Sequence, residues 1–213
     1  MRRYCGQSGF SLMEVLVALA VVLILIGALV GAGSYVKTRA NVDMTRGLIE
    51  TLSTALEEYY GNQVPNAFPF DTPDTNGNGI LGDDYFGADL LGDLSGTAII
   101  GILPGHQAAN PIPPPDTIVV SSASSAALFY FLDRNPASRV VASAVPNALI
   151  TNKDDGGTAI KIDIGGTEYD LPRYIDPWEM SIRYVYLPGT AFPVLTSAGP
   201  DKVFDTPDDI TSQ

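Results

Sequence analysis

Residues 9–36 read GFSLMEVLVALAVVLILIGALVGAGSYV, and this stretch decides how the N-terminal part of the chain folds. The 22 residues from Val15 to Val36 include no charged side chain. At about 1.5 Å of rise per residue, a helix of this length reaches roughly 33 Å, which matches a hydrocarbon core of about 30 Å. The stretch therefore predicts one transmembrane helix within residues 10–36.

Charges on the two sides of the apolar run predict its orientation. Arg2 and Arg3 precede the run, whereas residues 47–213 contain 7 Lys and Arg against 22 Asp and Glu. Because positive flanks stay on the cytoplasmic side of a membrane, we expect a cytoplasmic N-terminus and an exported C-terminal part. A cleaved secretory signal is the alternative interpretation, with Ala32-Gly33-Ser34 as its small-residue site.

The composition excludes several classes of function. The formal net charge is −12, so the chain lacks the clustered basic face that nucleic-acid binding requires. A single Cys and a single His argue against a zinc site, a disulfide framework and most His-dependent catalysis. His106 lies in a predicted loop flanked by Gly and Pro, and we expect it to be a solvated surface residue. The composition therefore argues against an enzyme.

Glu14 lies at the very start of the apolar run. A carboxylate there is costly unless it has a partner, although its position near the end also lets it reach interfacial water. Residues 9–19, GFSLMEVLVAL, resemble the processing and assembly motif of type IV pilins and type II secretion pseudopilins. The resemblance implies that prepilin peptidase removes a leader of residues 1–9, including Cys5, by cutting between Gly9 and Phe10. It also implies N-methylation of Phe10 and pairing of Glu14, the fifth mature residue, with the terminal ammonium of a neighbouring subunit.

Beyond the apolar run, the spacing predicts that the helix continues as an amphipathic stem over residues 37–62. An apolar stripe recurs every three or four residues, and Glu50, Glu57 and Glu58 lie off it. Gly61 is the predicted helix stop. The stripe consists of Leu48, Leu52, Ala55, Leu56 and Tyr59.

The resemblance implies the α+β pilin fold, in which a long N-terminal helix packs on a small antiparallel sheet with a loop-rich head. The head would comprise residues 63–213. Within it, residues 121–135 predict a helix with serine N-caps, and residues 161–165 predict an edge strand. Residues 63–167 otherwise resemble nothing that we can assign.

Two acidic loops are candidates for calcium. The weaker is DTNGNG at residues 74–79, where Asp74, Asn76 and Asn78 alternate as in the front half of an EF-hand loop. Its twelfth position is Tyr85 instead of a bidentate acid, and Asx-Gly clusters also form ordinary turns.

The stronger candidate loop is AGPDKVFDTPDDI at residues 198–210. Together with the Asp-Pro-Trp turn at 176–178 and the strand-like runs 181–186 and 194–197, it resembles the C-terminal half of the major pseudopilin of type II secretion systems. The sequence departs from that pattern at Pro200 and Lys202, which flank Asp201 where glycine is commoner, and at Glu179 and Met180, where Gly-Asn usually follows the tryptophan. The resemblance implies calcium ligands from the side chains of Asp201, Thr206 and Asp208 and the carbonyls of Ala198 and Val203, with Asp205 and Asp209 nearby.

Three functions follow from these observations. The first is a structural subunit of a type II secretion pseudopilus, assembled in the periplasm from copies of itself and other pseudopilins. Its partners would be prepilin peptidase and an inner-membrane assembly platform with its ATPase. The second is a type IV pilin, major or minor, of a surface fibre. A membrane-anchored exported enzyme is disfavoured, because the sequence offers no evident base or nucleophile.

Overall fold

The computed structural model describes residues 12–63, 66–70, 79, 81, 118–153, 159, 161–164, 167–187 and 189–213. Residues 1–40 and 41–213 form two compact units. The predictions for Cys5, Gly9, Phe10 and His106 lie outside the described residues, as do those for Asp74, Asn76 and Asn78 of the weaker calcium loop.

The predicted long helix is confirmed as α1 (Leu12–Asn62), which has 51 residues. It ends one residue beyond Gly61, so that glycine is not the helix stop. The last turn is closed locally, because the Asn62 side-chain amide donates to the carbonyl of Glu58 at 2.8 Å. Glu14 lies in the first turn of α1, where the helix dipole favours a negative charge.

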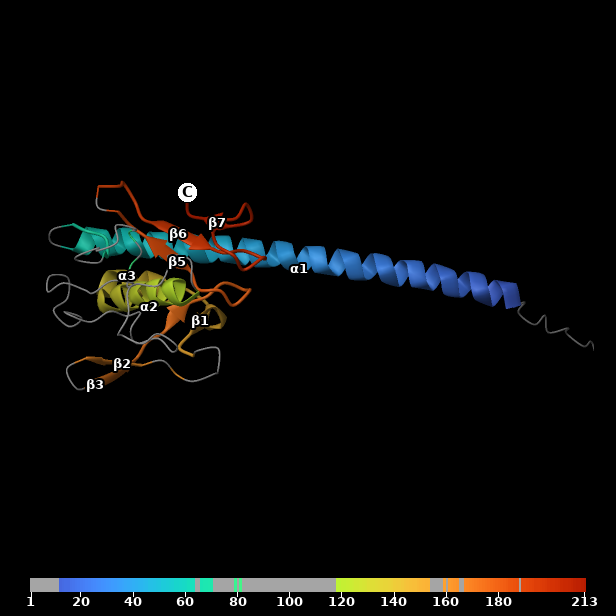
Figure 1. Cartoon of the computed structure of the whole chain (residues 1–213), viewed down its shortest axis with the longest axis horizontal. Coiled ribbons are helices and arrows are strands. Elements are labelled where there is room, and N and C mark those ends of the chain that lie inside the picture. The colour runs from blue at the N-terminus through green and yellow to red at the C-terminus, as the bar shows by residue number, and fades with distance from the viewer. Residues whose placement is uncertain are drawn as a thin grey trace, which may run out of the picture. The chain divides into compact units, whose positions relative to one another are not determined.

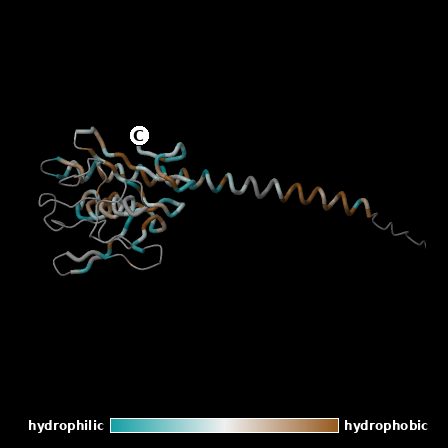
Figure 2. Tube along the Cα trace, in the orientation of Figure 1, coloured by the Kyte–Doolittle hydropathy of each residue, from teal (hydrophilic) through white to brown (hydrophobic). Residues whose placement is uncertain are grey.

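In the unit of residues 1–40, the described apolar side chains of α1 are exposed. Leu12 is 81% exposed and Ile24 is 72% exposed. Figure 2 shows the corresponding hydrophobic colour along this part of the helix. Among the residues whose side chains are described, which here leave out 28–32, no helix is both long and apolar enough to cross a membrane.

In the unit of residues 41–213, the predicted stripe of α1 is buried. Leu52, Ala55 and Leu56 are fully enclosed, while the three glutamates off the stripe are exposed. The stripe shares one hydrophobic core with α2 (Ile118–Arg134), and Tyr59 meets Phe131 edge to face with ring centroids 6.4 Å apart. Figure 1 shows α2 beside the C-terminal part of α1. This burial, more than intrinsic propensity, holds the stem helical.

Helix α2 begins three residues before its predicted start, and its serines are not N-caps. Ser124 and Ser125 are buried inside the helix and reach the main chain of two different strands. The Ser124 hydroxyl donates to the Tyr184 carbonyl at 2.9 Å and accepts from the Tyr184 amide at 2.8 Å. Ser125 makes the same pair of bonds with Tyr174, at 2.7 and 2.8 Å. Their role is therefore to satisfy buried strand backbone.

A short helix, α3 (Pro136–Ala142), follows α2 and was not predicted. Asn135 is its N-cap and accepts from the amides of Ala137 and Ser138, and Pro136 occupies the first turn. A 3-10 turn, η2 (Asn147–Leu149), then leads into the first strand.

Three small antiparallel sheets lie among the described residues of this unit. Strand β1 (Ile150–Thr151) pairs with β4 (Arg173–Tyr174), and β2 (Lys161–Ile164), the predicted edge strand, pairs with β3 (Thr167–Asp170). The third sheet has the order β5 (Arg183–Val185), β6 (Val194–Ser197) and β7 (Ile210–Thr211). Helices packed on small antiparallel sheets give the expected α+β class and agree with the pilin fold.

Candidate functional site: the C-terminal acidic loop

The acidic loop of residues 198–209 connects β6 to β7. Its two ends are fixed by the antiparallel ladder, in which Ser197 pairs with Ile210 and Thr196 with Thr211. Sequence reasoning predicted β6 but no strand at Ile210, because a two-residue strand has no periodicity to read. The ladder turns the acidic segment into a closed loop instead of a free tail.

Gly199 allows the two sides of this loop to approach each other. Its φ of +66° lies in the left-handed region, which glycine adopts without strain. A Cβ atom added there would lie 2.4 Å from the carbonyl oxygen of Asp208. Only a glycine therefore fits between the entrance and the exit of the loop.

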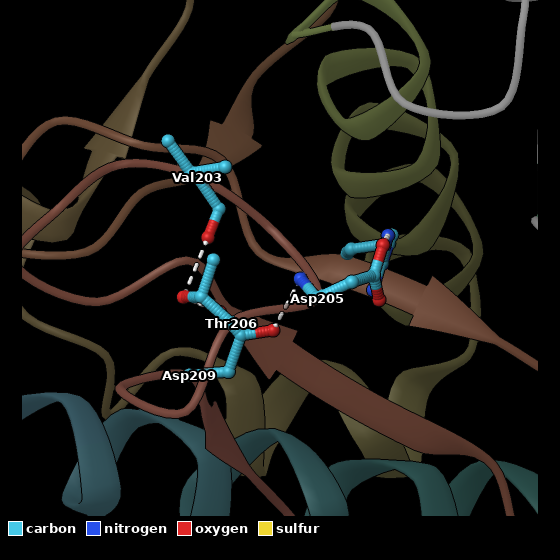
Figure 3. A network of polar contacts seen from close by, with 5 residues as sticks. Val203, Asp205, Thr206 and Asp209 are labelled. Carbon is cyan, nitrogen blue, oxygen red and sulfur yellow. Dashed lines mark hydrogen bonds and ion pairs between the residues drawn. The ribbon is translucent and has the colours of Figure 1, made fainter.

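Oxygen atoms converge on the Thr206 hydroxyl at the exit side of the loop. Within reach of Thr206 Oγ1 are Asp208 Oδ1 at 2.6 Å, the Val203 carbonyl at 3.1 Å and Asp209 Oδ1 at 3.4 Å. Figure 3 shows the Val203 carbonyl directed at the Thr206 hydroxyl, and the Asp209 carboxylate directed at the Asp205 amide. A hydroxyl has one proton to donate, so the acceptors here outnumber the donor. This excess of oxygen acceptors suits a hard cation such as calcium.

The two other acidic side chains of the predicted set differ in their contacts. Asp201 lies beside Asp208, because its amide donates to Asp208 Oδ2 at 3.1 Å. Its own carboxylate accepts from the Val203 amide at 2.8 Å. Asp205 instead forms an ion pair with Arg183 of β5, at 2.7 Å between Asp205 Oδ1 and Arg183 Nη2. Asp205 is thus directed to the sheet.

The predicted ligand set is therefore partly gathered. Asp201, Val203, Thr206, Asp208 and Asp209 lie together, while none of the described contacts joins the buried Ala198 to them. In the part of the chain that the structure describes, no three His, Cys, Asp or Glu side chains form a metal-binding group. An ion here would thus depend on a hydroxyl and carbonyls besides carboxylates.

Local hydrogen bonds shift the acidity of two loop carboxyls. The Thr206 hydroxyl, followed by the Asp201 amide, holds the pKa of Asp208 below its ordinary value of 3.8. The Arg183 guanidinium beside Asp205 lowers the pKa of that carboxyl as well. Both groups are consequently anionic at neutral pH, which is the form that binds cations.

Asp176 anchors the entrance of the loop from the Asp-Pro-Trp turn. The residue is 1% exposed, and one carboxylate oxygen accepts from the amides of Trp178 and Met180, both at 2.9 Å. The other accepts from the Ser197 hydroxyl at 2.6 Å, and that hydroxyl in turn accepts from the Gly199 amide at 3.1 Å. The sequence predicted the turn but not this link, which only the long-range pairing creates.

Comparison with known families matches one segment of the chain. Residues 5–30 match the family model of the prokaryotic N-terminal methylation motif. This match indicates a type IV pilin-like substrate of prepilin peptidase and a membrane-anchored precursor of a filament subunit. Proteins with this signal are generally structural subunits and not enzymes. Comparisons with curated proteins and with solved structures gave no match.

Proposed function

We propose that this chain is a structural subunit of a type II secretion pseudopilus. The methylation motif at residues 5–30 carries the proposal as far as a pilin-like subunit. The oxygen-rich loop between β6 and β7 favours a pseudopilin over a pilin, since it would supply a calcium site where many type IV pilins have a disulfide. The subunit would span the inner membrane once through residues 10–36, with its head in the periplasm, before entering the filament with its partners.

The N-terminal part acts in assembly through Glu14. After cleavage between Gly9 and Phe10, the new ammonium group of one subunit would neutralise Glu14 of its neighbour inside the bundle of apolar helices. Removing one member of such a buried pair leaves an uncompensated charge, at a cost of about 3–5 kcal/mol. Glu14 thereby favours entry of a subunit in the correct register.

Replacing Glu14 with alanine is expected to leave membrane insertion and leader removal intact while nearly abolishing filament assembly. Filaments isolated after disruption of the outer membrane, and the processed subunit, can both be quantified by immunoblot. Glu50→Ala, an exposed acid on the same helix, is the control and should assemble normally. Normal filament yield from Glu14→Ala would refute the pairing role.

Calcium is the ion that we propose for the C-terminal loop. Asp201, Thr206, Asp208 and the Val203 carbonyl would hold it, with Asp209 able to contribute and the Ala198 carbonyl as a further candidate ligand. All these donors are oxygens, and no nitrogen or sulfur donor from the described residues joins them, as calcium prefers. When bound, the ion neutralises carboxylates that otherwise repel one another across the loop.

Thermal unfolding of the full-length chain in detergent, in calcium and in EGTA, tests this site. A ligand at a hundred times its dissociation constant stabilises by about 2.7 kcal/mol, which raises the melting temperature by several degrees. Asp201→Ala and Asp208→Ala are expected to abolish the increase, whereas Asp170→Ala, an exposed acid on β3, should keep it. If calcium still raises the melting temperature of both loop variants, the weaker loop that begins at Asp74 is the ion site. If calcium does not raise the melting temperature of the natural chain, the alternative function, a type IV pilin, is favoured.

A further inference from the structure

Arg183 contacts the acidic loop from β5, a strand that the loop does not connect. The residue lies on β5, opposite Thr196 of β6, and its side chain is only 11% exposed. Its guanidinium grips Asp205 with two nitrogens, at 2.7 and 3.2 Å, in a bidentate arrangement. The same group lies over the ring of Phe204, 4.4 Å from the centroid. Two consecutive loop residues are therefore held by one rigid side chain.

Asp205 links Arg183 to the oxygen atoms around the Thr206 hydroxyl. Its φ of +67° is left-handed, a conformation that costs a non-glycine residue free energy and needs support from its surroundings. Its amide donates to Asp209 Oδ2 at 2.8 Å, as Figure 3 shows. Asp209 Oδ1 in turn lies 3.4 Å from Thr206 Oγ1. A continuous chain of contacts thus runs from Arg183 to the proposed ligands.

From this geometry we infer that Arg183 is a positioning residue for the calcium loop. The inference rests on the function proposed above. Arg183 keeps the Asp205 carboxylate paired with the sheet, so that this carboxylate does not bind the ion. It also fixes the conformation in which Thr206, Asp208 and Asp209 converge. Arginine is required here, because a lysine ammonium provides neither the planar fork nor the stacking on Phe204.

A purely electrostatic role for Arg183 would have the opposite effect. A cation beside an ion site repels calcium, so Arg183→Gln alone would strengthen binding and Asp205→Asn alone would weaken it. The double variant Arg183→Gln/Asp205→Asn has the same net charge as the natural chain. A loss of affinity in the double variant that also appears in Arg183→Lys, which keeps the cation and Asp205, is therefore attributed to positioning.

The experiment measures calcium affinity by titration calorimetry on the full-length chain in detergent, together with thermal unfolding in EGTA. We expect about tenfold weaker binding for the double variant, as for other residues that orient metal ligands. Arg183→Lys, which keeps the charge and perturbs folding least, should weaken binding in the same direction. Lys161→Gln, which removes a different ion pair with Glu168, is the control and should bind as the natural chain does.

The outcomes are distinguishable. If the natural chain binds no calcium, the proposed ion site fails and the inference fails with it. If the natural chain binds calcium and both the double variant and Arg183→Lys bind equally tightly, the ion site stands and the inference alone is overturned. Lower stability in EGTA with unchanged affinity would likewise overturn it, since that is the result of a merely structural ion pair.

Discussion

Replacing Gly199 with alanine is expected to force the C-terminal loop open and to destabilise the head by about 2–5 kcal/mol. The added Cβ would come within 2.4 Å of the Asp208 carbonyl, a main-chain atom that cannot move without displacing the exit of the loop. The left-handed φ adds a further penalty. Thermal unfolding in EGTA measures the loss, and repeating it in calcium should show no stabilisation.

Gly189→Ala is the matched control for this prediction. Gly189 also has a positive φ, of +101°, but a Cβ atom added there would have no neighbouring atom within 4 Å. Its replacement should therefore cost only the backbone penalty of about 1–2 kcal/mol and leave the effect of calcium intact. Equal losses for the two glycines would show that the close approach in the loop is unimportant.

Replacing Asp176 with alanine is expected to have the second large effect, a loss of about 3–5 kcal/mol. The substitution leaves the amides of Trp178 and Met180 and the Ser197 hydroxyl without their acceptor in a buried place, and each such group costs about 1–3 kcal/mol. Asp176→Asn keeps the shape and an oxygen acceptor, so it should lose much less. Chemical denaturation of both variants in EGTA gives the comparison.

The buried carboxyl of Asp176 also predicts that the stability of the head depends on pH. Burial raises the pKa of Asp176 above its ordinary value of 3.8, although its hydrogen bonds oppose the shift. The folded state then binds this proton more tightly than the unfolded state, so its contribution is largest below about pH 4 and is lost as pH rises through the raised pKa. Asp176→Asn should remove this decline, and an unchanged pH profile in that variant would contradict the assignment to Asp176.

Much of the fold could be predicted because its signals are periodic. The stripe from Leu48 to Tyr59 repeats over several turns, and α2 carries a comparable apolar face, so both helices were placed within a few residues. Strand β7 and helix α3 were missed, since two and seven residues are too short for a pattern to accumulate. Their existence depends on pairing with β6 and on the cap provided by Asn135.

The candidate site was less predictable. The spacing of acids in residues 198–210 indicated a loop that could hold calcium, but it gave no sign that Asp205 would turn to Arg183. The sequence showed that Glu179 and Lys202 depart from the pseudopilin pattern, but only the structure shows that their φ values are 70° and 62°. Side chains at these positions are tolerated although the backbone favours glycine.

The serines of α2 have a consequence for the order of folding. Ser124 and Tyr184 are 60 residues apart, and Ser125 and Tyr174 are 49 apart, so these bonds close long stretches of chain. Because the entropy of closing such long stretches is lost before the contacts can offset it, α2 is expected to dock late. The amide protons of Tyr174 and Tyr184, although they belong to strands, then exchange with solvent only when the helix detaches. We therefore expect the helix and the two strands that it joins to unfold as one cooperative unit.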